Sequence, residues 1–137
     1  MSDNQIGTYK LVASPFHLDV RGKLSMGVLG KHFLNCADAY AAERGFDVVE
    51  QGGEHYTWVL SRLAIELEDL PSCHESFGIQ TWVENVYRLF ADRNFVICDK
   101  DEKPIGYVRS VWAMISMETR NPANLLSLYG DRITNSI

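Results

Sequence analysis

The apolar residues between positions 25 and 45 recur at steps of three and four, which is the spacing of one face of an α-helix. Ser25 can cap the start of this helix, because a serine hydroxyl accepts hydrogen bonds from backbone N–H groups of the first turn. Gly45 suits the left-handed conformation that ends many helices. The pattern therefore predicts one long amphipathic helix. Its apolar stripe consists of Leu29, Phe33, Cys36, Ala37 and Tyr40.

Polar and apolar residues alternate on both sides of this helix, which is the period of a β-strand. A short alternating run at residues 8–13 opens the chain and breaks near Pro15. A polar segment at 101–104 predicts a hairpin connection. One helix followed by an antiparallel meander predicts an α+β domain in which a sheet covers the helix stripe. The strands expected after the helix span residues 58–68, 76–84, 89–98 and 105–117.

The strand at residues 58–68 is expected to be long and half-buried, so its alternating residues are assigned to two different faces. Its alternation puts Trp58 and Leu60 on one face, which becomes polar toward the end of the strand. The residues predicted to share the other face are Val59, Ser61, Leu63, Ile65 and Leu67.

Length and composition fit a single globular domain over residues 1–137. Apolar residues make up 46% of the chain, so one continuous core can form and disorder is not expected away from the ends. No stretch of about 18 apolar residues occurs, and we expect no membrane span. Residues 1–10 lack the apolar centre of a secretory signal. The net charge of −5 argues against non-specific nucleic-acid binding.

The spacing of cysteine and histidine gives no metal or disulfide pattern. Cys36, Cys73 and Cys98 form no C-x-x-C pair, and the four histidines form no H-x-x-x-H pair. We therefore expect no metal site and no cofactor. Free thiols fit a reducing cytoplasm.

Four short motifs fall on the predicted strands in a fixed order. They are WVLSRL at 58–63, TWV at 81–83, RNFVICD at 93–99, and SVWAMI at 110–115 followed by Thr119 and Arg120. Together they resemble the acyl-acyl carrier protein (acyl-ACP) thioesterase family, and the resemblance runs from Tyr9 to Leu126. It implies a hotdog fold, in which a curved antiparallel sheet wraps one long central helix.

The resemblance also implies that the two halves of the enzyme have different roles. In that family two hotdog repeats share one polypeptide, and the catalytic Asp-x-Asn-x-His motif belongs to the second. This chain resembles the first repeat, and residues 22–28 read GKLSMGV where the motif would stand. The intact enzyme would hydrolyse fatty acyl-ACP thioesters to free fatty acids, in fatty acid biosynthesis. We expect this half to bind the acyl chain and ACP, and to lack the catalytic residues when isolated.

Large side chains near the helix start and along the strands are the candidates for lining an acyl pocket. Core packing or packing against a partner accounts for them equally well, since a large aromatic side chain stabilises either environment. The predicted acyl-binding residues are Met26, Leu29, Phe33, Trp58, Ser61, Trp82 and Trp112.

Basic residues of the strand region are the candidates for docking the acidic ACP, by pairing with its carboxylates or with the pantetheine phosphate. Ordinary surface ion pairs with nearby acidic residues are the alternative. The predicted ACP-binding residues are Arg62, Arg93, Arg109 and Arg120.

Asp38 is a weak candidate for a catalytic acid, because some other hotdog thioesterases use a carboxylate on the helix. A solvated or interface position is the alternative interpretation. Two further hypotheses stay open: a homodimeric acyl-CoA thioesterase that uses Asp38, and a non-catalytic acyl-binding or dimerisation module. In every case we expect self-association or pairing with a second hotdog domain, because a lone sheet of this kind leaves an edge unpaired.

Overall fold

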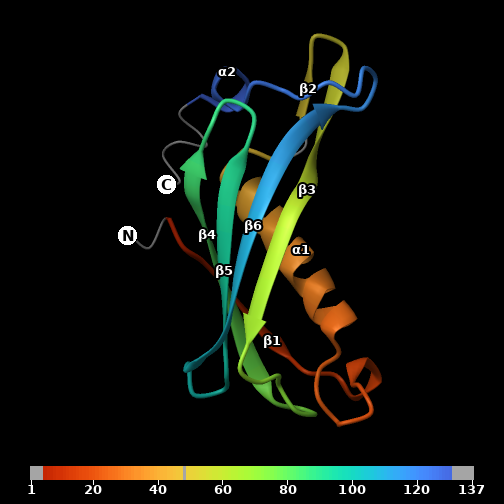
Figure 1. The fold of residues 1–137 in the computed structure, drawn as a ribbon, viewed down its shortest axis with the longest axis vertical. Helices are drawn as coiled ribbons and strands as arrows, with labels where there is room; N and C mark the ends of the chain where they lie inside the picture. Colours follow the sequence, from red (N-terminus) through yellow and green to blue (C-terminus); the bar gives the residue numbers. More distant parts are fainter. Residues whose placement is uncertain (1–4, 48, 131–137) are drawn as a thin grey trace.

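A single antiparallel sheet curls around one long helix in the computed structural model, which describes residues 5–47 and 49–130 (Figure 1). The strand order is β1-β4-β5-β6-β3-β2. The strands are β1 (Gly7–Val12), β2 (Val49–Gln51), β3 (Glu54–Leu67), β4 (Ser76–Val86), β5 (Ala91–Cys98) and β6 (Pro104–Ser116). The helices are the long α1 (Met26–Glu43), the short α2 (Leu125–Tyr129) and the 3-10 turn η1 (Pro15–His17). We call the sheet face toward α1 the inner face and the opposite one the outer face.

Helix α1 begins and ends where the sequence predicts. The Ser25 hydroxyl accepts a hydrogen bond from the backbone N–H of Val28 at 3.2 Å. Gly45, just beyond the helix end, has a φ of +75°. The whole predicted stripe is buried against the inner face of the sheet. The prediction of one amphipathic helix covered by a sheet is therefore confirmed.

The predicted strands appear as β1 and β3–β6, and the sheet gains one more strand. Strand β2 pairs with the start of β3 through a two-residue loop, Gly52 and Gly53. Both loop residues have positive φ, +61° and +78°, which suits a tight hairpin and favours glycine. The Gly-Gly dipeptide was a sequence signal for this hairpin.

A β-bulge makes the predicted face assignment of β3 partly wrong. The register with β6 shifts between Leu60 and Arg62, so Ser61 is an extra residue. Before the bulge, Leu60 lies opposite the buried Trp112 on the inner face. After it, Ile65 lies opposite the buried Val108, again on the inner face. Val59 therefore points to the outer face, and Trp58 and Leu60 share the inner face with Leu63, Ile65 and Leu67.

Two adjoining clusters make up the core between α1 and the sheet. The first contains Phe33 of α1, whose ring lies 5.2 Å from that of Phe95 in β5. The second contains Tyr40 and is closed by α2, whose Tyr129 ring stacks on Trp58 at 6.1 Å. Helix α2 lies near the hairpin between β4 and β5 in Figure 1. None of the described helices is long and apolar enough to cross a bilayer.

Candidate functional site

Four of the predicted acyl-binding residues meet in the space between α1 and the sheet. Leu29 and Phe33 come from the helix stripe, and Trp58 and Trp112 come from the inner faces of β3 and β6. This grouping follows from the 3.6-residue period of α1 and from the bulge, which turns Trp58 inward. The fold thus provides one apolar layer that a hydrocarbon chain could share.

The other three predicted acyl-binding residues lie elsewhere. Met26 is the first residue of α1 and its side chain is 46% exposed. Ser61 is the exposed bulge residue of β3. Trp82 lies on the outer face of β4, opposite Asn94 of β5. The structure does not bring these three side chains together with the inner group.

Both inner tryptophans are fixed by hydrogen bonds. The indole N–H of Trp58 donates to the carbonyl oxygen of Phe46 at 2.7 Å. The indole N–H of Trp112 donates to the hydroxyl of Ser110 at 2.8 Å, and that hydroxyl donates to the carbonyl of Arg93 at 2.7 Å. Because each buried indole has its partner, the rings present only apolar surface to the inner space.

A small cavity lies beside the two tryptophans. Its volume is about 10 Å³, close to the space that a single water molecule requires. The cavity is lined by Phe46, Trp58, Val83, Ala91, Arg93 and Trp112. A longer ligand would need neighbouring residues to move. Phe46 is the lining residue that lies outside the strands, and its ring contacts that of Tyr129 in α2.

Arg93 takes a different position from the other predicted ACP-binding arginines. It lies on the inner face of β5 and is only 5% exposed. Its guanidinium carbon lies 4.6 Å from the centre of the Tyr40 ring. Burial lowers the pKa of Arg93 to about 10. A docking protein has no access to this side chain, so we leave Arg93 out of the docking set below.

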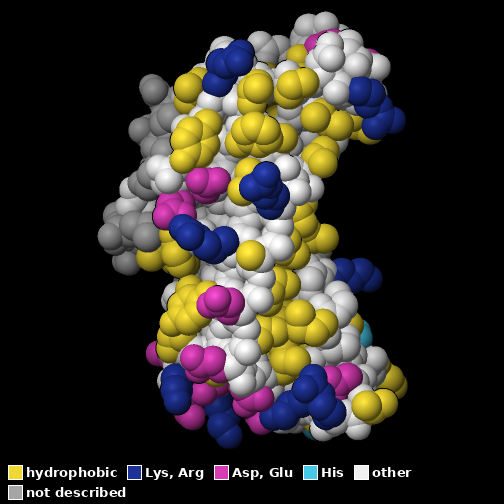
Figure 2. Space-filling view, in the orientation of Figure 1, with side chains coloured by type: hydrophobic (Ala, Val, Ile, Leu, Met, Phe, Trp, Pro, Cys, Tyr) yellow, Lys and Arg dark blue, Asp and Glu magenta, His cyan; other side chains and the backbone are white. Residues whose placement is uncertain are grey.

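Arg62 and Arg109 lie on the outer face, on the neighbouring strands β3 and β6. With Glu84, Asp92 and Asn94 they line an open depression of about 670 Å³. Figure 2 shows acidic and basic side chains mixed across the middle of this face, with hydrophobic side chains above and below. Arg120 is exposed in the turn after β6.

One of these two arginines already has a partner. Arg109 forms an ion pair with Glu84 at 3.2 Å, and the amide of Asn94 donates to the same carboxylate at 2.9 Å. The hydrogen bond from Asn94 and then that from Arg109 hold the pKa of Glu84 below its usual value. Arg62 forms no ion pair within the described part of the chain. The depression therefore keeps one cation for an incoming anionic group.

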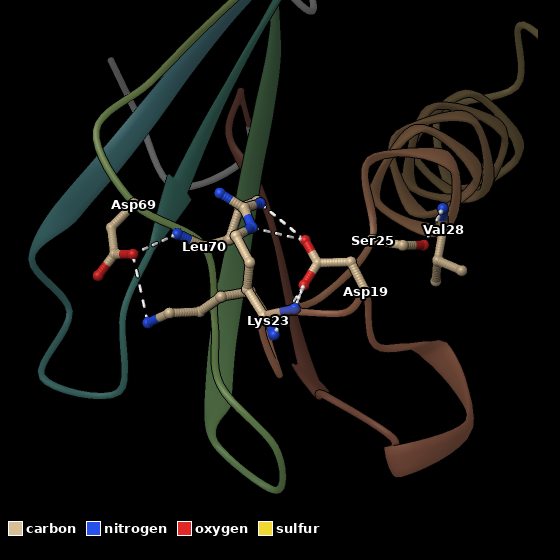
Figure 3. A network of polar contacts seen from close by, with 7 residues as sticks. Asp19, Lys23, Ser25, Val28, Asp69 and Leu70 are labelled. Atoms are coloured by element: carbon tan, nitrogen blue, oxygen red, sulfur yellow. Dashed lines mark hydrogen bonds and ion pairs between the residues drawn. The ribbon is translucent and has the colours of Figure 1, made fainter.

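The segment that leads into α1 is held by structural contacts, as Figure 3 shows. The carboxylate of Asp19 accepts hydrogen bonds from the guanidinium of Arg21 at 2.7 Å and from the backbone N–H of Lys23 at 3.2 Å. Lys23 also forms an ion pair with Asp69 at 3.4 Å, and Asp69 accepts from the backbone N–H of Leu70 at 2.8 Å. Asp19 thus holds the loop in its turn, and Asp69 connects the loop to the segment after β3.

The remaining chemical candidates offer no assembled catalytic group. Asp38 is exposed on the side of α1 away from the sheet. Burial raises the pKa of the Cys36 thiol to about 11, which suits a packed side chain rather than a nucleophile. Across residues 5–47 and 49–130, no three His, Cys, Asp or Glu side chains are grouped so that they could hold a metal ion.

This chain matches one family model and is similar in sequence to a plant enzyme. The model of the acyl-ACP thioesterase N-terminal domain family matches residues 9–131. The chloroplastic oleoyl-acyl carrier protein thioesterase of Coriandrum sativum is 31% identical over 67 residues, which are 48% of this chain and 18% of that protein.

Similar solved structures show the fold and how much of their chains this chain covers. An acyl-ACP thioesterase from Bacteroides thetaiotaomicron is 62% identical with a TM-score of 0.83, over 90% of this chain and 51% of that one. A DHNA-CoA thioesterase from Staphylococcus aureus, 19% identical with a TM-score of 0.80, is matched over 92% of this chain and 85% of that one. The predicted hotdog fold is therefore confirmed. This chain spans about half the length of the Bacteroides relative.

Proposed function

The chain belongs to the acyl-ACP thioesterase family, and on that basis we propose that it is the acyl-binding half of an enzyme that hydrolyses fatty acyl-ACP thioesters. The observation that carries the proposal is the apolar layer between α1 and the sheet, where Leu29 and Phe33 face Trp58 and Trp112. A fatty chain inserted there would leave water for an apolar environment, which favours binding by about 0.8 kcal/mol for each buried methylene. The second half of the enzyme would supply the catalytic residues.

The proposal is tested by mixing this chain with a long-chain acyl-ACP and recording native mass spectra over time. We expect a complex whose mass retains the intact thioester, because the chain binds the acyl group without cleaving it. Turnover near that of ordinary enzymes, about 1 per second or more, would contradict this division of labour. It would favour the homodimeric alternative, which Asp38→Asn would then test. Absence of any complex would contradict acyl-ACP binding itself.

The outer-face depression is the proposed docking surface for ACP, through Arg62 and Arg109. Arg120 is a further contact in this proposal because it is exposed. ACP is acidic, so its carboxylates would meet the free cation of Arg62 and compete with Glu84 for Arg109.

Reversing both charges with Arg62→Glu and Arg109→Glu is expected to weaken ACP binding by about tenfold, through loss of charge complementarity. Surface plasmon resonance with immobilised ACP measures the change. The matched control is Lys31→Glu with Lys103→Glu, which reverses two exposed charges on α1 and on the turn between β5 and β6. Equal weakening by both double variants would mean that net charge, not this depression, governs the contact.

The open edge of β3 is the proposed contact with a second hotdog domain. Strand β2 pairs with β3 only from Glu54 to Tyr56, so the edge from residue 57 to 67 has no neighbour in the described sheet. Leu63 of this strand lies opposite Ser110 on the inner face and is still 45% exposed. An unpaired edge with exposed apolar side chains favours association.

Leu63→Lys is expected to shift the isolated chain from a dimer toward a monomer, because the lysine places a charge in the contact. Light scattering at micromolar concentration measures the mass. Val59→Lys is the control, since Val59 is similarly exposed but lies on the outer face. A monomeric wild-type chain would contradict the proposed contact.

A further inference from the structure

Arg93 carries a polar group that its surroundings leave unsatisfied. Its Nε and Nη2 atoms are fully buried, and neither has a hydrogen-bond partner among the described residues. They are the only fully buried side-chain nitrogen or oxygen atoms of that kind in the part of the chain that the structure describes. Buried polar groups in folded proteins almost always have a partner. These two donor nitrogens of Arg93 therefore indicate an acceptor that the described residues do not provide.

Among the described residues, the charge of Arg93 has an aromatic partner but no acidic one. No described carboxylate forms an ion pair with it, and the carboxylate of Glu43 accepts from Tyr9 at 3.3 Å and pairs with Arg44. Arg44 places a second guanidinium carbon 3.6 Å from the centre of the same Tyr40 ring. With a pKa of about 10, Arg93 stays protonated at neutral pH. A buried cation beside another cation favours an acceptor that carries partial or full negative charge.

The side chains that line the cavity beside Arg93 offer no acceptor. The side chains of Phe46, Val83 and Ala91 are apolar, and the N–H groups of the two tryptophans are donors that already have partners. Among the side chains that line the cavity, Arg93 therefore has the only buried nitrogen or oxygen atoms without a partner, and they are donors. The cavity is complementary to a single oxygen atom within an otherwise hydrocarbon environment.

We propose that Arg93 anchors an oxygen atom at the far end of a bound acyl group, so that this chain binds ω-oxygenated acyl chains more tightly than plain ones. The inference rests on the proposed acyl-binding function and names a substrate class for it. A methyl end placed here would leave both donor nitrogens without a partner. A hydroxyl oxygen would accept from them, and a carboxylate would do so with charge-assisted bonds that are stronger still.

The test compares three acyl-pantetheine thioesters of equal chain length that end in methyl, hydroxyl or carboxylate. Their dissociation constants are measured by calorimetry with the wild-type chain at several chain lengths. We expect the hydroxyl ligand to bind about tenfold more tightly than the methyl ligand, the effect of one satisfied hydrogen-bond partner. The carboxylate ligand should bind more tightly again.

Arg93→Met should remove this preference, so that the methyl ligand binds at least as well as the hydroxyl one. The variant should fold, because it replaces a buried cation that lacks an ion pair with an apolar side chain of similar length. Arg88→Met, at an exposed position in the loop between β4 and β5, is the matched control and should keep the wild-type preference. The wild-type comparison needs no variant, so it decides the question even if Arg93→Met folds poorly.

Equal affinities of the wild-type chain for the methyl and oxygenated ligands would overturn the role of Arg93 and leave acyl binding intact. Failure of all three ligands to bind would overturn both the anchor and the proposed function. An unchanged preference in Arg93→Met would assign the effect to another group and would also contradict the proposal.

Discussion

Replacing Phe33 with alanine is expected to lower the free energy of unfolding by about 3–5 kcal/mol. Phe33 lies in the middle of α1, is 3% exposed, and contacts the Phe95 ring across the space between helix and sheet. Removing its ring would leave a cavity that the long strands of the sheet cannot readily close. Urea unfolding followed by circular dichroism measures the change.

The neighbouring residue provides the control for this prediction. Leu34 follows Phe33 in α1 but lies outside the buried stripe and is 47% exposed. Leu34→Ala is expected to change stability by no more than about 0.5 kcal/mol, as is usual for surface positions. Similar losses for the two variants would mean that the sheet does not hold α1 by its predicted stripe.

Gly106→Val is expected to lower the free energy of unfolding by about 2–3 kcal/mol through overpacking. Gly106 lies on the inner face of β6, between Leu67 of β3 and Ile97 of β5. A Cβ atom there would lie 2.4 Å from Leu67 Cδ2 and 2.7 Å from Ile97 Cγ2. The backbone oxygen of Glu66, at 3.1 Å, limits how far the strand can shift.

Gly78→Ala in β4 is the contrasting control. A Cβ at this position meets only the backbone oxygen of Tyr9, at the ordinary distance of 3.7 Å. Alanine should therefore be neutral or slightly stabilising, because a glycine within a strand loses more conformational freedom on folding. Thermal unfolding of both variants measures the difference. A Gly106→Val protein as stable as Gly78→Ala would contradict the close packing of β6 against its neighbours.

The helix and its buried stripe could be predicted because the information is local. A period of 3.6 residues, a serine at the start and a glycine at the end are all read within one segment. The orientation of β3 could not be read in this way. The extra residue at Ser61 becomes visible only through pairing with β6, and it reverses the face of Trp58 relative to the residues beyond it.

The candidate site was predictable only in part for a related reason. Trp58, Trp82 and Trp112 look alike in the sequence, and the pairing of the strands decides which of them face α1. Arg93 was grouped with the exposed arginines because charged residues are rarely buried. The alternation of Arg93 with Phe95 and Ile97 in β5 was the signal that it points inward.

The most direct test of the central claim is to find where the acyl chain lies. An acyl-ACP whose fatty chain ends in a photoreactive diazirine is irradiated with this chain, and the labelled residues are mapped by mass spectrometry. Acyl binding between α1 and the sheet predicts label on Phe33, Trp58 or Trp112. Label confined to outer-face residues such as Trp82 and Tyr107 would contradict the account.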